Sequence, residues 1–183
     1  MASLVHIRRE RCRGGCKRPG TGEPAGISVE VTNPQGTSVA TVTAQESSPA
    51  LFTYPLGEKT YAAAPFANET TYVAPEGALP GVASRAAKAG DYVVLYANAL
   101  ARCAGAPEGR TFSAGEHFPI EDLGSVQETL GGQPAKVLYA GMTSAGLWQI
   151  NIQVPEGVPA GPQPVVITSG GQRAATSPVL EMC

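Results

Sequence analysis

The chain has 183 residues, which is enough for one domain and part of a second. Its 22 Gly and 16 Pro, with 43% hydrophobic and only 15% charged residues, exclude a disordered chain and do not suit a helical bundle. The net charge of −2 divides unevenly, because residues 1–20 carry +5 (6 − 1) and the remainder carries −7 (7 − 14). An acidic body is poorly suited to gripping phosphates, so we expect no nucleic-acid partner.

The basic N-terminal segment, residues 1–23, is expected to be a disordered leader. It lacks the apolar core and cleavage site of a signal peptide. Nowhere does the chain contain the ~18 consecutive apolar residues that a membrane span needs. Cys12 and Cys16 lie near His6, but a structural zinc site needs four ligands and no second ligand pair is present. Cys103 and Cys183 bring the number of cysteines to four. Four cysteines can form disulfides in three alternative arrangements, and the sequence does not distinguish among them.

An internal half-repeat suggests the domain organisation. Residues 24–33 read PAGISVEVTN and residues 159–169 read PAGPQPVVITS, and each run leads into a turn and a second strand-like stretch. We interpret residues 24–49 as the C-terminal hairpin of a partial preceding module and residues 50–183 as a complete module. A lone hairpin is marginally stable, so the hairpin at 27–43 is also a candidate for pairing with a second copy in a homodimer.

Short strands dominate the rest of the chain. Residues 148–154 (WQINIQV) alternate apolar and polar, which places Trp148, Ile150, Ile152 and Val154 on one buried face. Residues 92–96 form an apolar strand, Gly131-Gly132 a hairpin turn, and only residues 84–89 and 121–124 read as helical turns. The pattern predicts an all-β fold, an immunoglobulin-like antiparallel β-sandwich.

The stretches GDYVVLYANAL and GGQPAKVLYAGMTSAGLWQINIQVPEGVPAGPQPVVITSGGQ resemble a C-terminal immunoglobulin-like domain of unknown function. That domain is found in secreted multidomain proteins of soil acidobacteria, and the resemblance covers about residues 24–183. It implies an extracellular or cell-surface location and an interaction or architectural role, without an assigned ligand or catalytic residue. Residues 1–23 depart from the family pattern.

A hydrolytic site would need a nucleophile, a base and an orienting group. The chain offers Ser144 in GMTSAG as the nucleophile, His117 in the acidic loop SAGEHFPIED as the base, and Asp122 as the orienting group. The surroundings of Ser144 match a nucleophile elbow only loosely, because Met142 stands where that motif has Gly. A turn before the strand at 148–154 is the alternative interpretation of Ser144.

The same loop supplies candidate calcium ligands. Glu116, Glu121 and Asp122 offer the carboxylate oxygens that this hard cation prefers. No D-x-D-x-D-G loop occurs, so a calcium site would have to be irregular, and a solvated acidic loop is the simpler interpretation.

Aromatic residues give a last set of recognition candidates. Trp148 occupies an inward slot of its strand, which favours core packing over a role as a binding platform. Tyr54, Tyr61 and Tyr72 lie in a turn-rich stretch and are better candidates for surface recognition.

Two hypotheses for the function follow. The first is a non-catalytic extracellular interaction or architectural module from a larger exported bacterial protein, with an unknown protein or carbohydrate surface as partner and no cofactor. The second is a small hydrolase of lactones or carboxylic esters, assisted by calcium, with Ser144, His117 and Asp122 as its catalytic residues.

Overall fold

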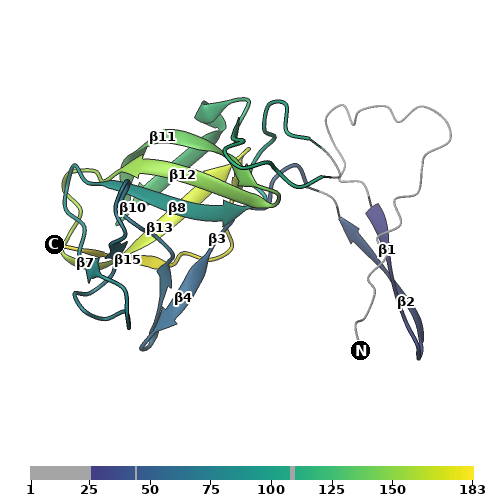
Figure 1. The fold of residues 1–183 in the computed structure, drawn as a ribbon, viewed down its shortest axis with the longest axis horizontal. Helices are drawn as coiled ribbons and strands as arrows, with labels where there is room; N and C mark the ends of the chain where they lie inside the picture. Colours follow the sequence, from purple (N-terminus) through teal and green to yellow (C-terminus); the bar gives the residue numbers. More distant parts are fainter. Residues whose placement is uncertain (1–25, 44, 108–109) are drawn as a thin grey trace. The chain divides into compact units, whose positions relative to one another are not determined.

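The computed structural model describes residues 26–43, 45–107 and 110–183. The chain forms two compact units, residues 1–45 and residues 46–183. Figure 1 traces both units along the sequence.

The first unit contains a β-hairpin among its described residues. Strand β1 (Gly26–Asn33) pairs antiparallel with β2 (Gly36–Thr43) over eight residues each, across a turn at Pro34-Gln35. Gly36 has a φ of 147°, which only glycine adopts readily in such a tight turn. The strand and turn predicted at the start of the half-repeat are therefore confirmed.

The second unit is built around one long sheet rather than two. Its strands follow in the order β3-β8-β12-β11-β10-β13-β15-β5-β4, with β14 added beside β13 and β9 beside β11. In Figure 1, β8, β12 and β11 lie side by side, and β10 and β13 pass behind them. The strands are β3 (Ala50–Leu51), β4 (Thr53–Leu56), β5 (Lys59–Ala62), β8 (Tyr92–Asn98), β9 (Phe118–Pro119), β10 (Val126–Leu130), β11 (Gln133–Ser144), β12 (Leu147–Gln153), β13 (Gly161–Ser169), β14 (Gln172–Arg173) and β15 (Val179–Met182).

The two ends of this sheet are joined through a single residue, Phe52. It lies between β3, which pairs with β8, and β4, which pairs with β5. The Phe52 N–H donates to the Tyr96 carbonyl at 2.8 Å, and the Phe52 carbonyl accepts from the Ala63 N–H at 2.8 Å. One short stretch of chain thus pairs with β8 on one side and with the β5 end on the other, and the nine-strand sheet becomes a nearly closed barrel.

The predicted immunoglobulin-like β-sandwich is therefore wrong in architecture, although the all-β class is confirmed. A sandwich has two separate sheets. Here the strands belong to one sheet, and each strand is staggered relative to its neighbours, as closure of a barrel requires. Strand β13 pairs with β15 through residues 161–164 and with β10 through residues 165–169. Strand β11 likewise pairs with β10 near its start and with β12 over the rest.

Side chains fill the barrel interior. The strand at 147–153 turns Ile150 and Ile152 fully inward, Val154 follows at 2% exposure, and Trp148 packs against the same core, as its alternation predicts. The largest fully buried side chains come from strands all around the barrel: Leu95, Leu130, Ile150, Ile152, Ile167 and Leu180. Burying such side chains contributes roughly 1.5–3 kcal/mol each, so the interior is the main source of stability.

The segment between β5 and β8 is fixed by Arg85. Its guanidinium lies 3.5 Å from the ring centroid of buried Phe66 and donates to Asp91 Oδ2 at 2.8 Å. Short parallel strands β6 (Tyr72–Val73) and β7 (Ser84–Arg85) form here, so the helical turn predicted at residues 84–89 is wrong. The turn predicted at residues 121–124 does occur, as the 3₁₀ helix η1 (Leu123–Ser125).

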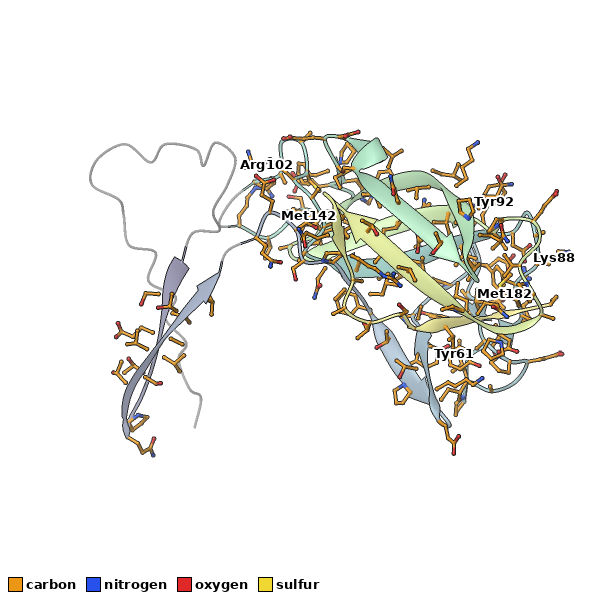
Figure 2. The ribbon with its side chains drawn as sticks, turned by 180° about the vertical axis from the view of Figure 1, so that it is seen from behind. Tyr61, Lys88, Tyr92, Arg102, Met142 and Met182 are labelled. Atoms are coloured by element: carbon orange, nitrogen blue, oxygen red, sulfur yellow. The ribbon has the colours of Figure 1, made fainter. Side chains whose placement is uncertain are left out.

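The second copy of the half-repeat differs from the first in its pairing. Strand β13 begins at the Gly of PAG, as β1 does, but its partner is divided between β14 and β15. Strand β15 also pairs in parallel with β5 at Val179 and Tyr61, and Figure 2 shows the structure from behind with Tyr61 of β5 labelled. Within the described ranges, no helix is long and apolar enough to cross a membrane.

Because the Phe52 backbone closes the barrel, we expect substitutions at position 52 to destabilise the fold mainly when they remove the backbone N–H. Phe52→Pro removes the N–H that donates to Tyr96, and we expect it to lower the free energy of unfolding by about 1–3 kcal/mol. Phe52→Ala keeps that N–H and removes a side chain that is 45% exposed, so its effect is expected to be clearly smaller. Urea unfolding followed by tryptophan fluorescence compares them, and equal losses would contradict the backbone explanation.

Candidate functional site

A polar face lies on the outside of β11 and β12. Because Ile150 and Ile152 point inward, the intervening Gln149 and Asn151 point outward. Across the ladder Asn151 pairs with Tyr139, and Gln149 pairs with Gly141. These residues therefore share one outer surface of the barrel.

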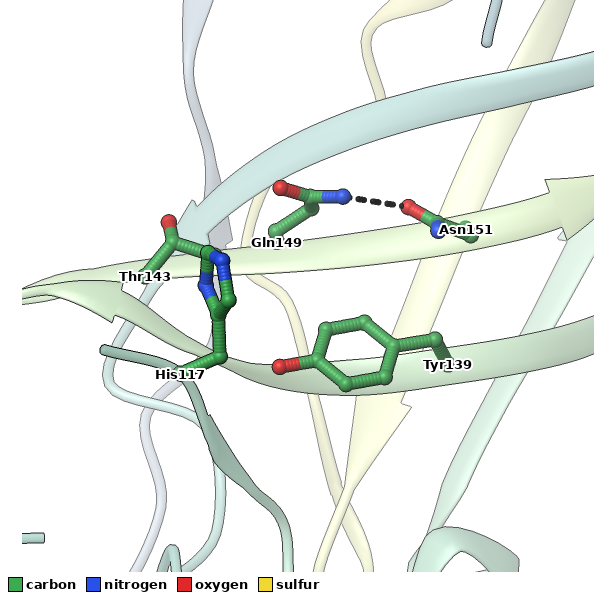
Figure 3. Close-up of a pocket in the computed structure, with 5 residues that line it drawn as sticks. All are labelled: His117, Tyr139, Thr143, Gln149 and Asn151. Carbon is green, nitrogen blue, oxygen red and sulfur yellow. Dashed lines mark hydrogen bonds between the residues drawn. The ribbon is translucent and has the colours of Figure 1, made fainter. Parts of the chain in front are cut away.

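Strand β9 brings His117 to this surface. Phe118 pairs with Met142 and Pro119 pairs with Gly141, so His117, the residue before β9, reaches the end of β11. A cavity of about 210 Å³ results, lined by His117, Tyr139, Thr143, Gln149 and Asn151. Figure 3 shows the Tyr139 hydroxyl directed toward His117, with Gln149 and Asn151 side by side on β12. We call these five residues the outer pocket.

A bulge gives the outer pocket its composition. Between Val137 and Tyr139 the register with β12 shifts by one residue, and Leu138 is the extra residue. Val137 pairs with inward Ile152, whereas Tyr139 pairs with outward Asn151. The bulge therefore turns Tyr139 to the outside.

Gly141 provides the space in which Tyr139 lies. A Cβ at position 141 would collide with the Tyr139 hydroxyl and would lie 2.6 Å from the Phe118 carbonyl oxygen. The Tyr139 hydroxyl is buried, and it has no hydrogen-bond partner among the described residues. Burial raises the pKa of this phenol, which therefore stays protonated.

The outer pocket is built without carboxylates or permanent cations. The Gln149 amide N–H donates to the Asn151 side-chain oxygen at 2.8 Å, which fixes both amides (Figure 3). The Gln149 side-chain oxygen and the Asn151 side-chain N–H groups have no other partner among the described residues, and they suit a ligand that both donates and accepts hydrogen bonds.

The proposed catalytic residues are not gathered around this pocket. His117 is exposed and lines it, but Ser144 and Asp122 do not. Ser144 is exposed at the end of β11 and pairs with Leu147 across the turn. Asp122 caps η1 by accepting from the Gly124 N–H at 2.9 Å. No hydrogen bond in the described part of the chain links any two of the three.

The calcium candidates are likewise engaged separately. Glu116 accepts two hydrogen bonds of 2.8 Å from Arg110 and one of 2.6 Å from the Ser113 N–H. The Arg110 guanidinium, followed by the Ser113 amide, lowers the pKa of Glu116 to about 2. Asp122 caps η1 and Glu121 is exposed, and among the residues described no three His, Cys, Asp or Glu side chains gather in a metal-binding group.

The aromatic residues considered for surface recognition differ in their exposure. Tyr72 is half-buried, but Tyr61 is only 4% exposed and donates to Glu181 Oε2 at 2.8 Å, so its predicted surface role is wrong. Tyr54 stacks on Tyr61 with ring centroids 6.1 Å apart. Trp148 packs against the core, as expected.

The cysteines show no pairing within the part that the structure covers. Cys103 is buried, Cys183 is exposed, and both are free. Burial raises the pKa of the Cys103 thiol, partly offset by the Met142 backbone and the Trp148 indole N–H. His6, Cys12 and Cys16 lie outside the described residues.

The sequence interpretation missed one buried charged residue, Glu128. It lies in β10 in register with inward Val126 and Leu130, is 3% exposed, and neither of its carboxylate oxygens has a partner among described residues. Burial raises its pKa to about 8. Alternation over VQETL would have placed it inside, and Gln149 and Asn151 could have been found from the outward positions of residues 148–154.

Comparison with family models, curated proteins and solved structures finds no match to this chain. The fold and the site define an all-β, nearly closed barrel with a polar pocket on its outer wall that contains no carboxylate, Lys or Arg.

Gly141→Ala tests the packing beneath the outer pocket. The added Cβ must displace the Tyr139 hydroxyl and the Phe118 backbone, and we expect a loss of about 1–3 kcal/mol in the free energy of unfolding. Tyr139→Phe serves as the control, because it removes a buried hydroxyl without a partner and should leave stability unchanged or raised. Chemical denaturation of both variants decides, and a harmless Gly141→Ala would refute the close contact.

Glu128 predicts a specific dependence of stability on pH. Its pKa is raised from 4.5 to about 8, so between these values the folded protein holds a proton that the unfolded chain has lost. The free energy of unfolding should therefore fall as pH rises from about 5 to 8, by up to about 1.4 kcal/mol per pH unit, and then level off.

The measurement is urea unfolding of wild type and Glu128→Gln at pH 5, 6, 7 and 8. Glu128→Gln cannot ionise, so the difference between the two proteins isolates this carboxyl. Parallel pH profiles would show that Glu128 titrates normally.

Proposed function

We propose that the protein is a non-catalytic binding module whose outer pocket takes a neutral, polyhydroxylated ligand such as a carbohydrate. The observation that carries the proposal is the outer pocket itself, with five uncharged or weakly basic polar side chains around about 210 Å³. Polar groups that converge on one concave surface fix the orientation of a small ligand.

The chemistry of the pocket favours sugar hydroxyls. A hydroxyl donates one hydrogen bond and accepts two, which matches the amides of Gln149 and Asn151. The half-buried Tyr139 adds an unused hydroxyl donor and an aromatic ring. A charged ligand would find no permanent opposite charge, because the lining contains neither a carboxylate nor a Lys or Arg.

The extracellular setting is proposed from the sequence resemblance alone, whose implied immunoglobulin-like fold the barrel does not share. We propose that the module acts outside the cell or at its surface, as part of a larger exported protein. The hydrolase hypothesis gains no support from the geometry, since His117 lines the outer pocket without Ser144 or Asp122.

Gln149→Ala tests the proposal against a matched variant. We expect it to weaken binding of an oligosaccharide about tenfold, which corresponds to one lost hydrogen bond of about 1.4 kcal/mol. Gln153→Ala makes the same change on the outer face of β12, two residues beyond Asn151 and outside the pocket, and should leave binding unchanged.

The measurement is an NMR titration of the ¹⁵N-labelled protein with a panel of neutral and acidic oligosaccharides. Shifts confined to β9, β11 and β12 with a neutral sugar would support the proposal. No saturable shifts, or equal weakening in both variants, would refute it.

A further inference from the structure

The barrel wall opens between β10 and β11. Strand β10 pairs with β13 through all five of its residues, but with β11 only at residues 128–130. Beyond the pair Glu128–Ala135, β11 leaves to follow β12. The resulting opening has a volume of about 440 Å³ and is rimmed by η1; its lining includes Leu123, Val126, Glu128, Pro134, Ala135 and Val137. We call it the seam pocket.

Glu128 belongs to the wall of the seam pocket. It is 3% exposed, and in the described part of the chain both carboxylate oxygens lack a hydrogen-bond partner. Ionising a buried carboxyl that has no hydrogen-bond partner costs several kcal/mol. A carboxyl of this kind in a pocket wall therefore has unused hydrogen-bonding capacity that a ligand can fill.

The elements packed around Glu128 supply no counter-charge. Its ladder partners are Ala135 on β11 and Ile167 on β13, and β13 contains no charged residue. The charged residue of β11 is Lys136. It is exposed, and it lies on the face of the strand opposite to that of Ala135 and Val137. At η1 the one carboxylate is Asp122, which is used to cap Gly124.

We propose that the seam pocket binds a small organic cation, a primary ammonium carried on a short apolar body. The ammonium supplies three N–H donors to the two unpartnered oxygens of Glu128, and the apolar body lies against Leu123, Val126 and Val137. This site is separate from the outer pocket and does not depend on the function proposed for it.

The composition of the seam pocket selects this class of ligand. A hard metal cation needs six or more oxygen ligands, and the described residues bring no three ligating side chains together. An anion would face a carboxyl group without any neighbouring cation. Glu128 is one of the residues that line the opening, and in the proposed complex rotation about its side-chain bonds brings the carboxyl to the ligand.

Binding must release a proton. The free protein holds Glu128 neutral at pH 7, because burial raises its pKa to about 8. The bound ammonium stabilises the carboxylate, so the acid proton leaves to solvent as the ion pair forms. Affinity should therefore rise about 50-fold from pH 6 to pH 8, in proportion to the ionised fraction of Glu128.

The test uses benzylammonium as the probe and benzyl alcohol as its neutral match, titrated into the full chain by calorimetry at pH 6, 7 and 8. We expect saturable binding of benzylammonium that tightens with pH, weaker binding of benzyl alcohol, and at least a tenfold loss in Glu128→Gln. Glu156→Gln makes the same change at an exposed carboxylate and should bind as wild type.

NMR of the wild-type Glu128 carboxyl carbon gives a readout that needs no variant. Its pKa should fall by at least one pH unit when benzylammonium is present. The proposal is overturned if benzylammonium does not bind, if benzyl alcohol binds equally well, or if the Glu128 pKa is unchanged at saturation.

Discussion

The two backbone hydrogen bonds of Phe52 hold together the arrangement on which the rest of the second unit depends. One bond ties the chain to β8 and the other to the residue after β5, so the first and last strands of the sheet path become neighbours. The interior is then enclosed by strands except where β10 and β11 separate, which is why Leu95, Ile150 and Ile167 are fully buried. A sheet left open at this point would expose that apolar face to water.

Both candidate sites depend on how β11 crosses the barrel wall. Near its start it separates from β10 and leaves the seam pocket, with Glu128 in the wall. Beyond the bulge at Leu138 it lies beside β12 and presents Tyr139 outward to His117 and Asn151. One pocket is an opening in the barrel wall beside an acid that has no partner among the described residues, and the other lies on the outer surface among neutral polar groups. Their ligands should accordingly differ in charge and polarity.

Local patterns predicted the strands well and the architecture poorly. Alternation in residues 148–154 identified the inward face of β12, because burial of every second residue produces an apolar–polar alternation in the sequence. Barrel closure depends on pairing between Phe52 and strands about ten and forty residues away, and a sandwich would show the same alternation. Sequence reasoning found His117 but paired it with Ser144, since it could not see that β9 lies against Gly141. Glu128 was missed although its alternation was visible.

The bulge at Leu138 also determines how this protein can be altered. Before it, the odd-numbered residues Ala135 and Val137 pack against the core; after it, the even-numbered Ala140 does. Anyone who randomises alternate positions of β11 to create new binding specificities would disturb core and surface together if the spacing of two were kept across residue 138. A library confined to positions 139 and 143 would vary outward-facing residues, whereas position 141 has room only for glycine.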